Sequence, residues 1–193
     1  MISEVVLSGT DIHSDERGMF AEMYRSEDGE PIFSQCNVSI SEPGVLRGLH
    51  GIFDRPQGKL VVCIEGEVLD VAVDLRPGSR TFGYHIAETL CPERMNKIYV
   101  PPGFAHGFCV VGNEPATVIY MCTTNWNNDG FSVAWDDLDL AISWPVSDPV
   151  LSEKDQRGIS LAEYIRLVSN PSRARTLSRV RARPAPRKKD PRP

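Results

Sequence analysis

Short apolar segments separated by turn residues recur along most of this chain, and they limit the folds available to it. Each segment is a few residues long and rich in Val, Ile and Leu, which favours strands over helices. Clusters of proline, glycine and asparagine divide the segments, as in 42–44, 76–78, 101–103 and 127–130. The expected strands cover residues 4–7, 19–24, 33–40, 59–65, 67–75, 84–90, 96–100, 107–111 and 117–123. Many short strands at regular spacing predict an all-β sandwich or barrel.

One expected strand has two faces of different chemistry. Residues 70–75 read Asp-Val-Ala-Val-Asp-Leu, and successive side chains of a strand point in opposite directions. The valines and the leucine therefore share one face, and the two aspartates and the alanine share the other. This second face is either the polar wall of a pocket inside a barrel or a solvated outer surface, and the pattern leaves both open.

Helix signals are confined to the C-terminal part of the chain. Residues 160–168 are predicted to form a helix with Ser160 as N-cap and Glu163 three residues later, and residues 152–155 to start one helical turn. Pro171 ends the helix, and the segment 171–193 has prolines and very few large apolar residues. We therefore expect one domain over residues 1–170 and a basic, proline-rich, disordered tail over residues 171–193.

Charge and cysteine content exclude several classes of protein. The net charge is −5, and 9 of the 21 Lys and Arg residues lie in the segment 171–193, so the body is strongly acidic. An acidic body argues against a nucleic-acid partner, and no apolar run is long enough for a membrane partner. The five cysteines include no CxxC pair, and the start of the chain has no secretory pattern. We expect reduced, mostly buried thiols in a cytoplasmic protein.

Four residues form a candidate set for proton transfer. His50 and His106 are each expected at the end of a glycine-containing turn, and histidine takes and returns protons near neutral pH. Lys59 and Tyr120 lie in expected strands and add a cation and a phenolic acid. Taken singly, each has an ordinary interpretation: a hydrogen-bonded histidine, a solvated lysine or a core tyrosine. No His-x-His pair exists, so we expect no metal.

Seven motifs, in order, resemble one enzyme family. They are DERGMFAE at 15–22, RGLH at 47–50, GKLV at 58–61, DVAVDLR at 70–76, TFG at 81–83, GFAHGF at 103–108 and LSEKD at 151–155. Together they resemble the dTDP-4-dehydrorhamnose 3,5-epimerase family from about Asp15 to about Asp155. The resemblance implies a cupin-type jelly-roll barrel with short C-terminal helices. It also implies a homodimer that epimerises a dTDP-linked 4-keto-6-deoxy sugar without a cofactor.

The family assigns a role to each residue of the proton-transfer set. His50 matches the general base, and Asp155 matches the aspartate that orients it. Lys59 and His106 match groups near the C4 carbonyl oxygen of the sugar, with Asp70 as a candidate support for His106. In the family, the residue that matches Tyr120 reprotonates carbon from the opposite face. A base and an acid on opposite faces of an enolate invert the carbon centre.

The resemblance also implies the residues that bind the nucleotide. Arg17, Phe20 and Glu22 belong to an N-terminal segment that, in the family, crosses to the neighbouring subunit and helps to hold the nucleotide there. The other matching residues are Gln35, Asn37, Arg47, Trp126 and Lys154, with Trp126 stacking on the base where the family often has tyrosine.

Two departures from the family leave the regiochemistry open. Gly51 and Ile52 follow His50 where the family has an aromatic residue and glutamine, and the segment 23–34 is shorter than usual. We expect inversion at both C3 and C5, and the alternative is a 3-epimerase of an antibiotic or other deoxysugar pathway. A metal-dependent cupin enzyme and a non-catalytic sugar-binding cupin are further alternatives.

Overall fold

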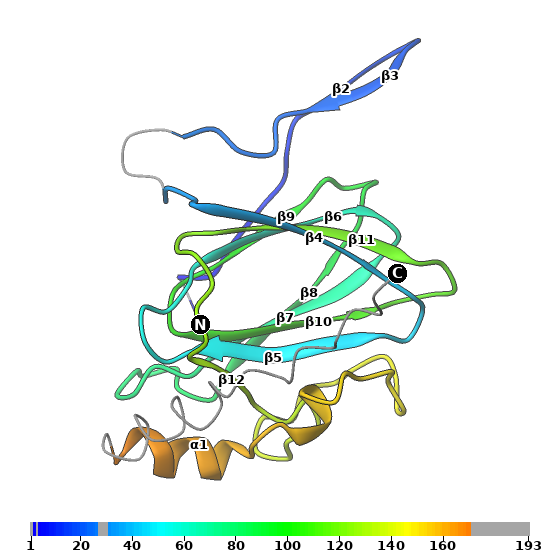
Figure 1. Ribbon diagram of the computed structural model, residues 1–193. Coiled ribbons are helices and arrows are strands. Elements are labelled where there is room, and N and C mark those ends of the chain that lie inside the picture. The colour runs from blue at the N-terminus through cyan, green and yellow to red at the C-terminus, as the bar shows by residue number, and fades with distance from the viewer. Residues whose placement is uncertain (1, 3, 27–30, 171–193) are drawn as a thin grey trace, which may run out of the picture.

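The structure is a computed structural model in which residues 2, 4–26 and 31–170 are described. Two five-stranded antiparallel sheets face each other and enclose a barrel (Figure 1). The first sheet comprises, in order, β1 (Val6–Ser8), β9 (Lys97–Val100), β6 (Lys59–Glu65), β11 (Ala116–Cys122) and β4 (Gln35–Ser41). The second comprises β12 (Gly130–Ser132), β5 (Leu46–Ile52), β10 (Phe104–Val110), β7 (Val68–Asp74) and β8 (His85–Leu90). The predicted all-β jelly-roll architecture is confirmed.

Two hydrophobic clusters account for the position of the sheets. One fills the space between them and includes Val61, Ala72 and Val118. The other lies outside the second sheet, where Val71 and Val73 of β7 pack against the C-terminal segment, and it includes Leu75 and Tyr164. Both faces of β7 are therefore buried, and burial of these side chains supplies much of the drive for folding.

The two aspartates of β7 are both fully buried. Asp70 faces the barrel interior, whereas Asp74 accepts hydrogen bonds from Arg76, Ser79 and Thr81 at the end of the strand. The solvated-surface interpretation of this face is wrong, and the polar-pocket interpretation holds for Asp70. The hydrogen bonds lower the pKa of Asp74, although burial alone would raise it.

The segment that carries His50 is a strand and not a turn, which corrects the sequence-based prediction. His50 lies within β5 and His106 lies within β10, and the two are cross-strand partners. The glycines of this segment resemble turn residues, so the strand was not predicted. In the structure they allow β5 to pair with β10. Gly48 has φ +136°, and a Cβ atom there would lie 2.6 Å from the Cα atom of Gly107. Only glycine allows β5 and β10 to approach so closely.

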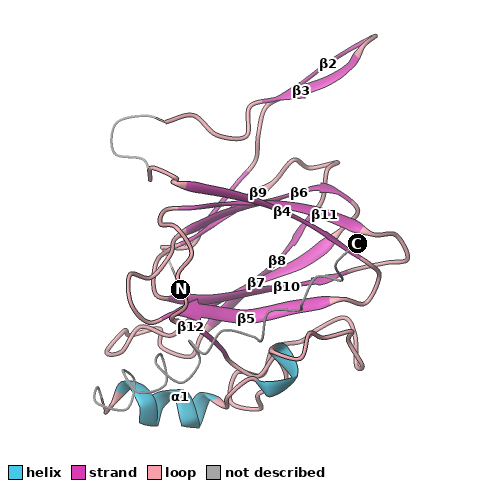
Figure 2. Cartoon of the chain, in the orientation of Figure 1, coloured by secondary structure: helices cyan, strands magenta, loops and turns pink. Residues whose placement is uncertain are grey.

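The C-terminal helices match the prediction. A 3₁₀ turn, η1 (Asp155–Arg157), precedes helix α1 (Leu161–Val168), and both lie against the outside of the second sheet (Figure 2). The backbone N–H of Glu163 donates to the side chain of Ser160 over 3.1 Å, which is the predicted N-cap. The segment 171–193 lies outside the described residues, so its disorder and the domain end at residue 170 stay predictions.

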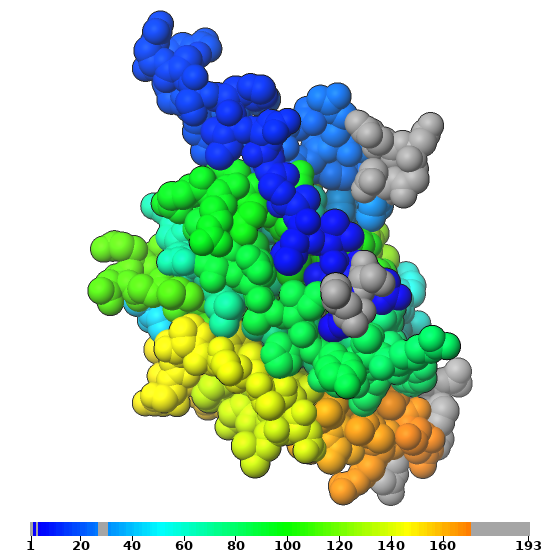
Figure 3. Space-filling model, turned by 180° about the vertical axis from the view of Figure 1, so that it is seen from behind, coloured from blue at the N-terminus to red at the C-terminus, as the bar shows by residue number. Residues whose placement is uncertain are grey.

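The N-terminal hairpin stands apart from the barrel. Strands β2 (Ile12–Asp15) and β3 (Gly18–Ala21) pair only with each other and project from the body, as Figure 3 shows from behind. The side chain of Phe20 at its tip region is 66% exposed. The sequence predicted only one strand in this hairpin and missed β2. It also missed the short strand β12 of the second sheet.

Within the described part of the chain, no helix is long and apolar enough to span a membrane.

Candidate active site

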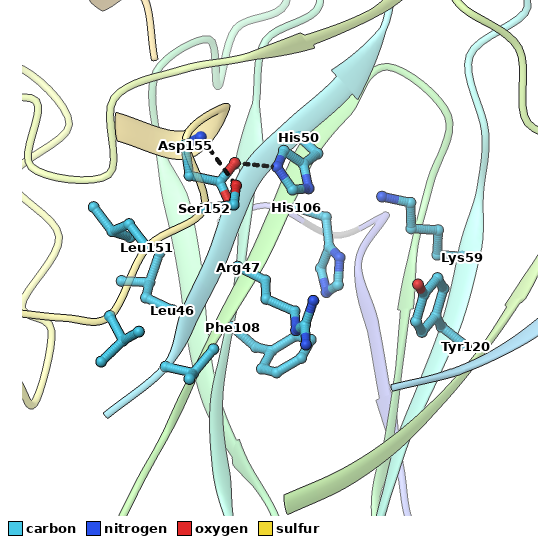
Figure 4. Close-up of a pocket in the computed structure, with 12 residues that line it drawn as sticks. Leu46, Arg47, His50, Lys59, His106, Phe108, Tyr120, Leu151, Ser152 and Asp155 are labelled. Atoms are coloured by element: carbon cyan, nitrogen blue, oxygen red, sulfur yellow. Dashed lines mark hydrogen bonds and ion pairs between the residues drawn. The ribbon is translucent and has the colours of Figure 1, made fainter. Parts of the chain in front are cut away.

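A cavity of about 360 Å³ opens between the two sheets, and the predicted proton-transfer residues line it. His50 and His106 enter from β5 and β10 of one sheet, and Lys59 and Tyr120 enter from β6 and β11 of the other. Figure 4 shows the amine of Lys59 and the hydroxyl of Tyr120 directed across the cavity towards the histidines. The fold therefore brings all four residues together from opposite walls.

A register shift explains how β5 presents two polar side chains to the cavity. Arg47 and His50 are three residues apart, so a regular strand would direct them to opposite faces. The pairing of β5 with β10 is irregular between His106 and Phe108, and both Arg47 and His50 line the cavity. A local irregularity of this kind re-aims side chains beside a site.

His50 and Asp155 form a short hydrogen-bonded pair. The Nε2 atom of His50 lies 2.5 Å from Oδ1 of Asp155, whose side chain is only 3% exposed. The other ring nitrogen points into the cavity (Figure 4). Burial lowers the pKa of His50, and the hydrogen bond to Asp155 opposes that shift. The ring is therefore neutral near pH 7 and has a nitrogen free to take a proton.

The carboxylate of Asp155 is stabilised in its charged form. Burial alone would raise its pKa, but the hydrogen bond with His50 and one from Ser152 bring the pKa below its usual value. A negative charge is therefore fixed beside the imidazole. Such a charge favours the imidazolium that forms when the ring accepts a proton.

His106 forms a second pair deeper in the barrel. Its Nε2 atom lies 2.8 Å from Oδ2 of Asp70, and the side chains are 8% and 0% exposed. The two residues come from the neighbouring strands β10 and β7. The expected support of His106 by Asp70 is present in the geometry. This pair is buried on all sides except at the cavity.

The cation and the phenol of the site have pKa values shifted by burial. Burial lowers the pKa of Lys59, and the nearby Cys122 and Asp70 oppose the shift. Burial raises the pKa of Tyr120, so its hydroxyl stays protonated at neutral pH and can donate. A poorly solvated ammonium next to a forming oxyanion is an effective electrostatic stabiliser.

A second pocket of about 310 Å³ adjoins the first and shares His50, Lys59 and Tyr120 with it. Four of the residues that the resemblance assigns to nucleotide binding line this second pocket: Gln35, Asn37, Trp126 and Lys154. The backbone N–H of Trp126 donates to Oε1 of Gln35 over 2.7 Å. These four residues thus form one group at one end of the site.

The remaining predicted binding residues lie elsewhere. Arg47 lines the first cavity and donates to the Ser41 hydroxyl over 2.9 Å, away from the Gln35 group. Arg17 pairs with Asp15 in the projecting hairpin, and Glu22 pairs with Arg25. Arg17, Phe20 and Glu22 are therefore not at the cavity of their own chain.

Two serines next to the site were not predicted. The hydroxyls of Ser152 and Ser132 both donate to the carboxylate of Asp155. Residues 152–155 were predicted only to start a helical turn, and the Ser-x-x-Asp spacing there could also have indicated Ser152 as a partner of Asp155. Ser132 lies opposite His50 in β12, a strand that the sequence pattern did not reveal.

The donor groups needed for a metal site are not gathered anywhere in the described residues. Among them, no group of three or more His, Cys, Asp and Glu side chains could hold an ion. The cysteines are free thiols, and four of the five are buried.

Comparison with known proteins identifies the same family that the sequence motifs resemble. A model of the dTDP-4-dehydrorhamnose 3,5-epimerase family matches residues 1–163. A dTDP-4-dehydrorhamnose 3,5-epimerase of Pseudomonas aeruginosa is 44% identical over 170 residues, which are 84% of this chain and 93% of that protein. A dTDP-4-dehydrorhamnose 3-epimerase of Streptomyces niveus is 37% identical over 78% of this chain and 76% of its own length.

A solved structure is also similar. The crystal structure of dTDP-6-deoxy-D-glucose-3,5-epimerase from Legionella pneumophila, in complex with dTDP-4-keto-L-rhamnose, superposes with a TM-score of 0.80. The two sequences are 40% identical, and the superposed region covers 84% of this chain and 93% of the Legionella chain. The family model, the identity to known members and the similarity of fold all indicate the same family. This chain belongs to the dTDP-4-dehydrorhamnose 3,5-epimerase family.

Proposed function

We propose that this protein inverts C3 and C5 of a dTDP-4-keto-6-deoxy-hexose in deoxysugar biosynthesis of the rhamnose type. One observation carries the proposal: a neutral histidine with a carboxylate partner and a protonated tyrosine face one cavity from opposite sheets. A sugar ring between them would meet a base on one face and an acid on the other. This is the geometric requirement for inverting a carbon centre.

Each group has one step in the mechanism. The free ring nitrogen of His50 removes the proton from the carbon next to the C4 ketone, and Asp155 stabilises the imidazolium. The electron pair of the broken C–H bond moves into the ring and places negative charge on the C4 oxygen. Lys59 and His106 stabilise that oxyanion. The hydroxyl of Tyr120 then protonates the carbon from the other face.

Both C3 and C5 flank the same ketone, so one base and one oxyanion site serve either carbon. The ring must turn between the two events to present the second C–H bond to His50. Gly51 and Ile52 line the second pocket, and a Cβ atom at position 51 would lie 2.2 Å from the ring of Phe131 on the adjacent strand. That ring fills the space that a side chain at position 51 would need.

The binding of the nucleotide is proposed for the second pocket. Trp126 offers an aromatic face for the base, and Lys154, Gln35 and Asn37 offer a cation and amides for the polar groups of a nucleotide. Arg47 supplies a further cation at the other end of the site. The chemistry is proton transfer alone, so we propose that the enzyme needs no metal and no cofactor. Activity that is lost on chelation and restored by added metal would contradict this. The five free thiols support a separate proposal, that the enzyme is cytoplasmic.

A homodimer with an exchanged N-terminal segment is part of the proposal. Strand β4 directs Gln35 and Asn37 towards the second pocket, whereas Val38 and Ile40 on its other face are 64% and 68% exposed. An apolar row on the outside of a sheet is typical of a covered surface. A second copy would cover it, and the projecting β2–β3 hairpin would then bring Arg17, Phe20 and Glu22 to the partner's site.

The dimer is tested by charging that surface. Val38→Glu combined with Ile40→Glu should give a monomer in light scattering that binds dTDP poorly. Leu138→Glu is the matched control, because Leu138 is 91% exposed in a loop on another part of the surface and the dimer should persist. Tight dTDP binding by a proven monomer would contradict the exchange.

The regiochemistry is tested by solvent exchange. The reaction is run in D₂O with the dTDP-4-keto-6-deoxyglucose substrate, and deuterium is located by NMR. Label and inversion at both C3 and C5 would support the proposal. Label at C3 alone, with C5 unchanged, would favour the 3-epimerase alternative. The relative from Streptomyces niveus is named as such a 3-epimerase.

A further inference from the structure

The carboxylate of Asp155 has two hydroxyl donors in addition to His50. Its Oδ1 atom accepts from His50 and, over 3.4 Å, from the hydroxyl of Ser132. Its Oδ2 atom accepts from the hydroxyl of Ser152 over 2.8 Å. Each oxygen of the carboxylate is therefore held, and the oxygen opposite the histidine is held by Ser152.

Ser152 also holds the backbone of the same turn. Its Oγ atom accepts the backbone N–H of Asp155 over 3.2 Å while its own proton goes to Oδ2. The two hydrogen bonds close a ring that links the side chain and the main chain of Asp155. Rotation of the carboxylate would break the 2.8 Å contact, and hydrogen bonds to charged groups are among the stronger ones in proteins.

The contact of Ser132 is weaker by geometry. Its 3.4 Å distance is long for an O–H···O bond, so it constrains the carboxylate less than Ser152 does. Ser132 is nevertheless the cross-strand partner of His50 and approaches the same oxygen that His50 contacts. The two serines thus provide a strong and a weak version of one interaction.

We propose that Ser152 is a positioning residue that aims the carboxylate of Asp155 at His50. It acts through Asp155 and not on the sugar. Without it the carboxylate turns away, the imidazolium loses part of its support, and His50 becomes a weaker and poorly oriented base. For its kinetic consequences the inference rests on the proposed function, but its structural content does not.

Ser152→Ala removes none of the other charged and titratable groups that face His50. Lys154 from the adjacent turn and Lys59 from β6 both lower the pKa of His50 by their charge. His106 is its partner on β10, and Tyr120 faces it from β11. A change in the titration of His50 therefore reports on the carboxylate.

The direct test is an NMR titration of the imidazoles in the full-length protein without substrate, with His50 assigned by its loss in His50→Gln. Ser152→Ala should move the midpoint of His50 to lower pH by about half a unit, because the support of the imidazolium weakens. Ser132→Ala should move it in the same direction by less. Ser152→Thr keeps the hydroxyl and should restore the original midpoint.

Ser160→Ala is the matched control. It removes a serine hydroxyl from the same C-terminal segment, where that hydroxyl only caps helix α1. It should lower the melting temperature and leave the midpoint of His50 unchanged. If Ser152→Ala does not fold, Ser152→Cys keeps the volume with a much weaker donor and should show the same downward shift.

Kinetics with the dTDP-4-keto-6-deoxy sugar give the second readout. Ser152→Ala should lower kcat about tenfold with little change in KM, because misplacement of a base affects the chemical step. A higher KM with normal kcat would show a substrate contact and overturn the proposal. So would an unmoved or raised midpoint of His50. Absence of epimerase activity in the unmodified protein would reject the proposed function, and the titration would still decide the role of Ser152.

Discussion

The site contains two histidine–aspartate pairs whose surroundings differ. In the His50–Asp155 pair the histidine is 34% exposed to the cavity, and its partner comes from a segment 105 residues away. In the His106–Asp70 pair both residues lie on neighbouring strands and the histidine is 8% exposed. The same two side chains are therefore suited to different tasks. An accessible ring with a free nitrogen can move a proton, whereas an enclosed ring is suited to hold a fixed hydrogen bond.

Removal of the accessible histidine should have the largest effect. His50→Ala is expected to lower kcat by about 10³-fold, because general-base catalysis is lost at the step that breaks the C–H bond. Isothermal titration with dTDP should show nearly unchanged binding, since His50 acts on the sugar. Near-normal turnover would reject the role of His50.

Replacement of its partner should be milder but should move the pH dependence. Asp155→Asn is expected to lower kcat by about 10²-fold, because the ring loses its orientation. The charge and hydrogen bond of Asp155 raise the pKa of His50 against the effect of burial, so their loss lowers that pKa further. His50 must be neutral to act, and the acidic limb of the kcat/KM profile should therefore shift to lower pH. An unchanged profile would argue against a working pair.

The corresponding change in the His106–Asp70 pair should leave the pH profile of kcat/KM unchanged. Asp70→Asn is expected to lower kcat about tenfold, because it weakens the hydrogen bond that orients His106, the group proposed to lie beside the C4 oxygen. The acidic limb of the kcat/KM profile reports on His50 and should not move. A shift equal to that of Asp155→Asn would mean that the two pairs act as one unit.

Deletion of the segment after helix α1 is expected to have the smallest effect on turnover. Deletion of residues 171–193 leaves Asp155 and the helix in the chain, so the accessible pair should form as before. Turnover should stay within a few-fold of the full-length value, measured at equal protein concentration. A loss of solubility or activity would show that this segment has a structural role and that the domain does not end at residue 170.

The sequence predicted the architecture and the chemical groups better than the local geometry. Alternation in 70–75 and the capping signal at Ser160 depend on neighbouring residues, and the structure follows both. The strand around His50 was missed because Gly48 looks like a turn residue, and its close approach to Gly107 is visible only when the two strands pair.

Long-range pairing also explains what the sequence could not give for the site. The link of His50 to Asp155 came from resemblance to a family, since no local pattern joins residues so far apart. The contact of Ser132 depends on the register of β12 against β5, which no short-range signal encodes. Arg47 was grouped with Gln35, but the length of β4 separates the two ends of the site.

The late position of Asp155 has a consequence for synthesis of the chain. All the strands of the two sheets precede it, so a nascent protein can pair its sheets while His50 still lacks its carboxylate partner. Docking of the segment around η1 is the event that completes the pair. Premature termination between residues 133 and 154 would leave a chain that carries every strand of the two sheets, with His50 and His106, but no carboxylate beside His50. Catalytic competence would then appear only in chains whose translation has continued past the barrel.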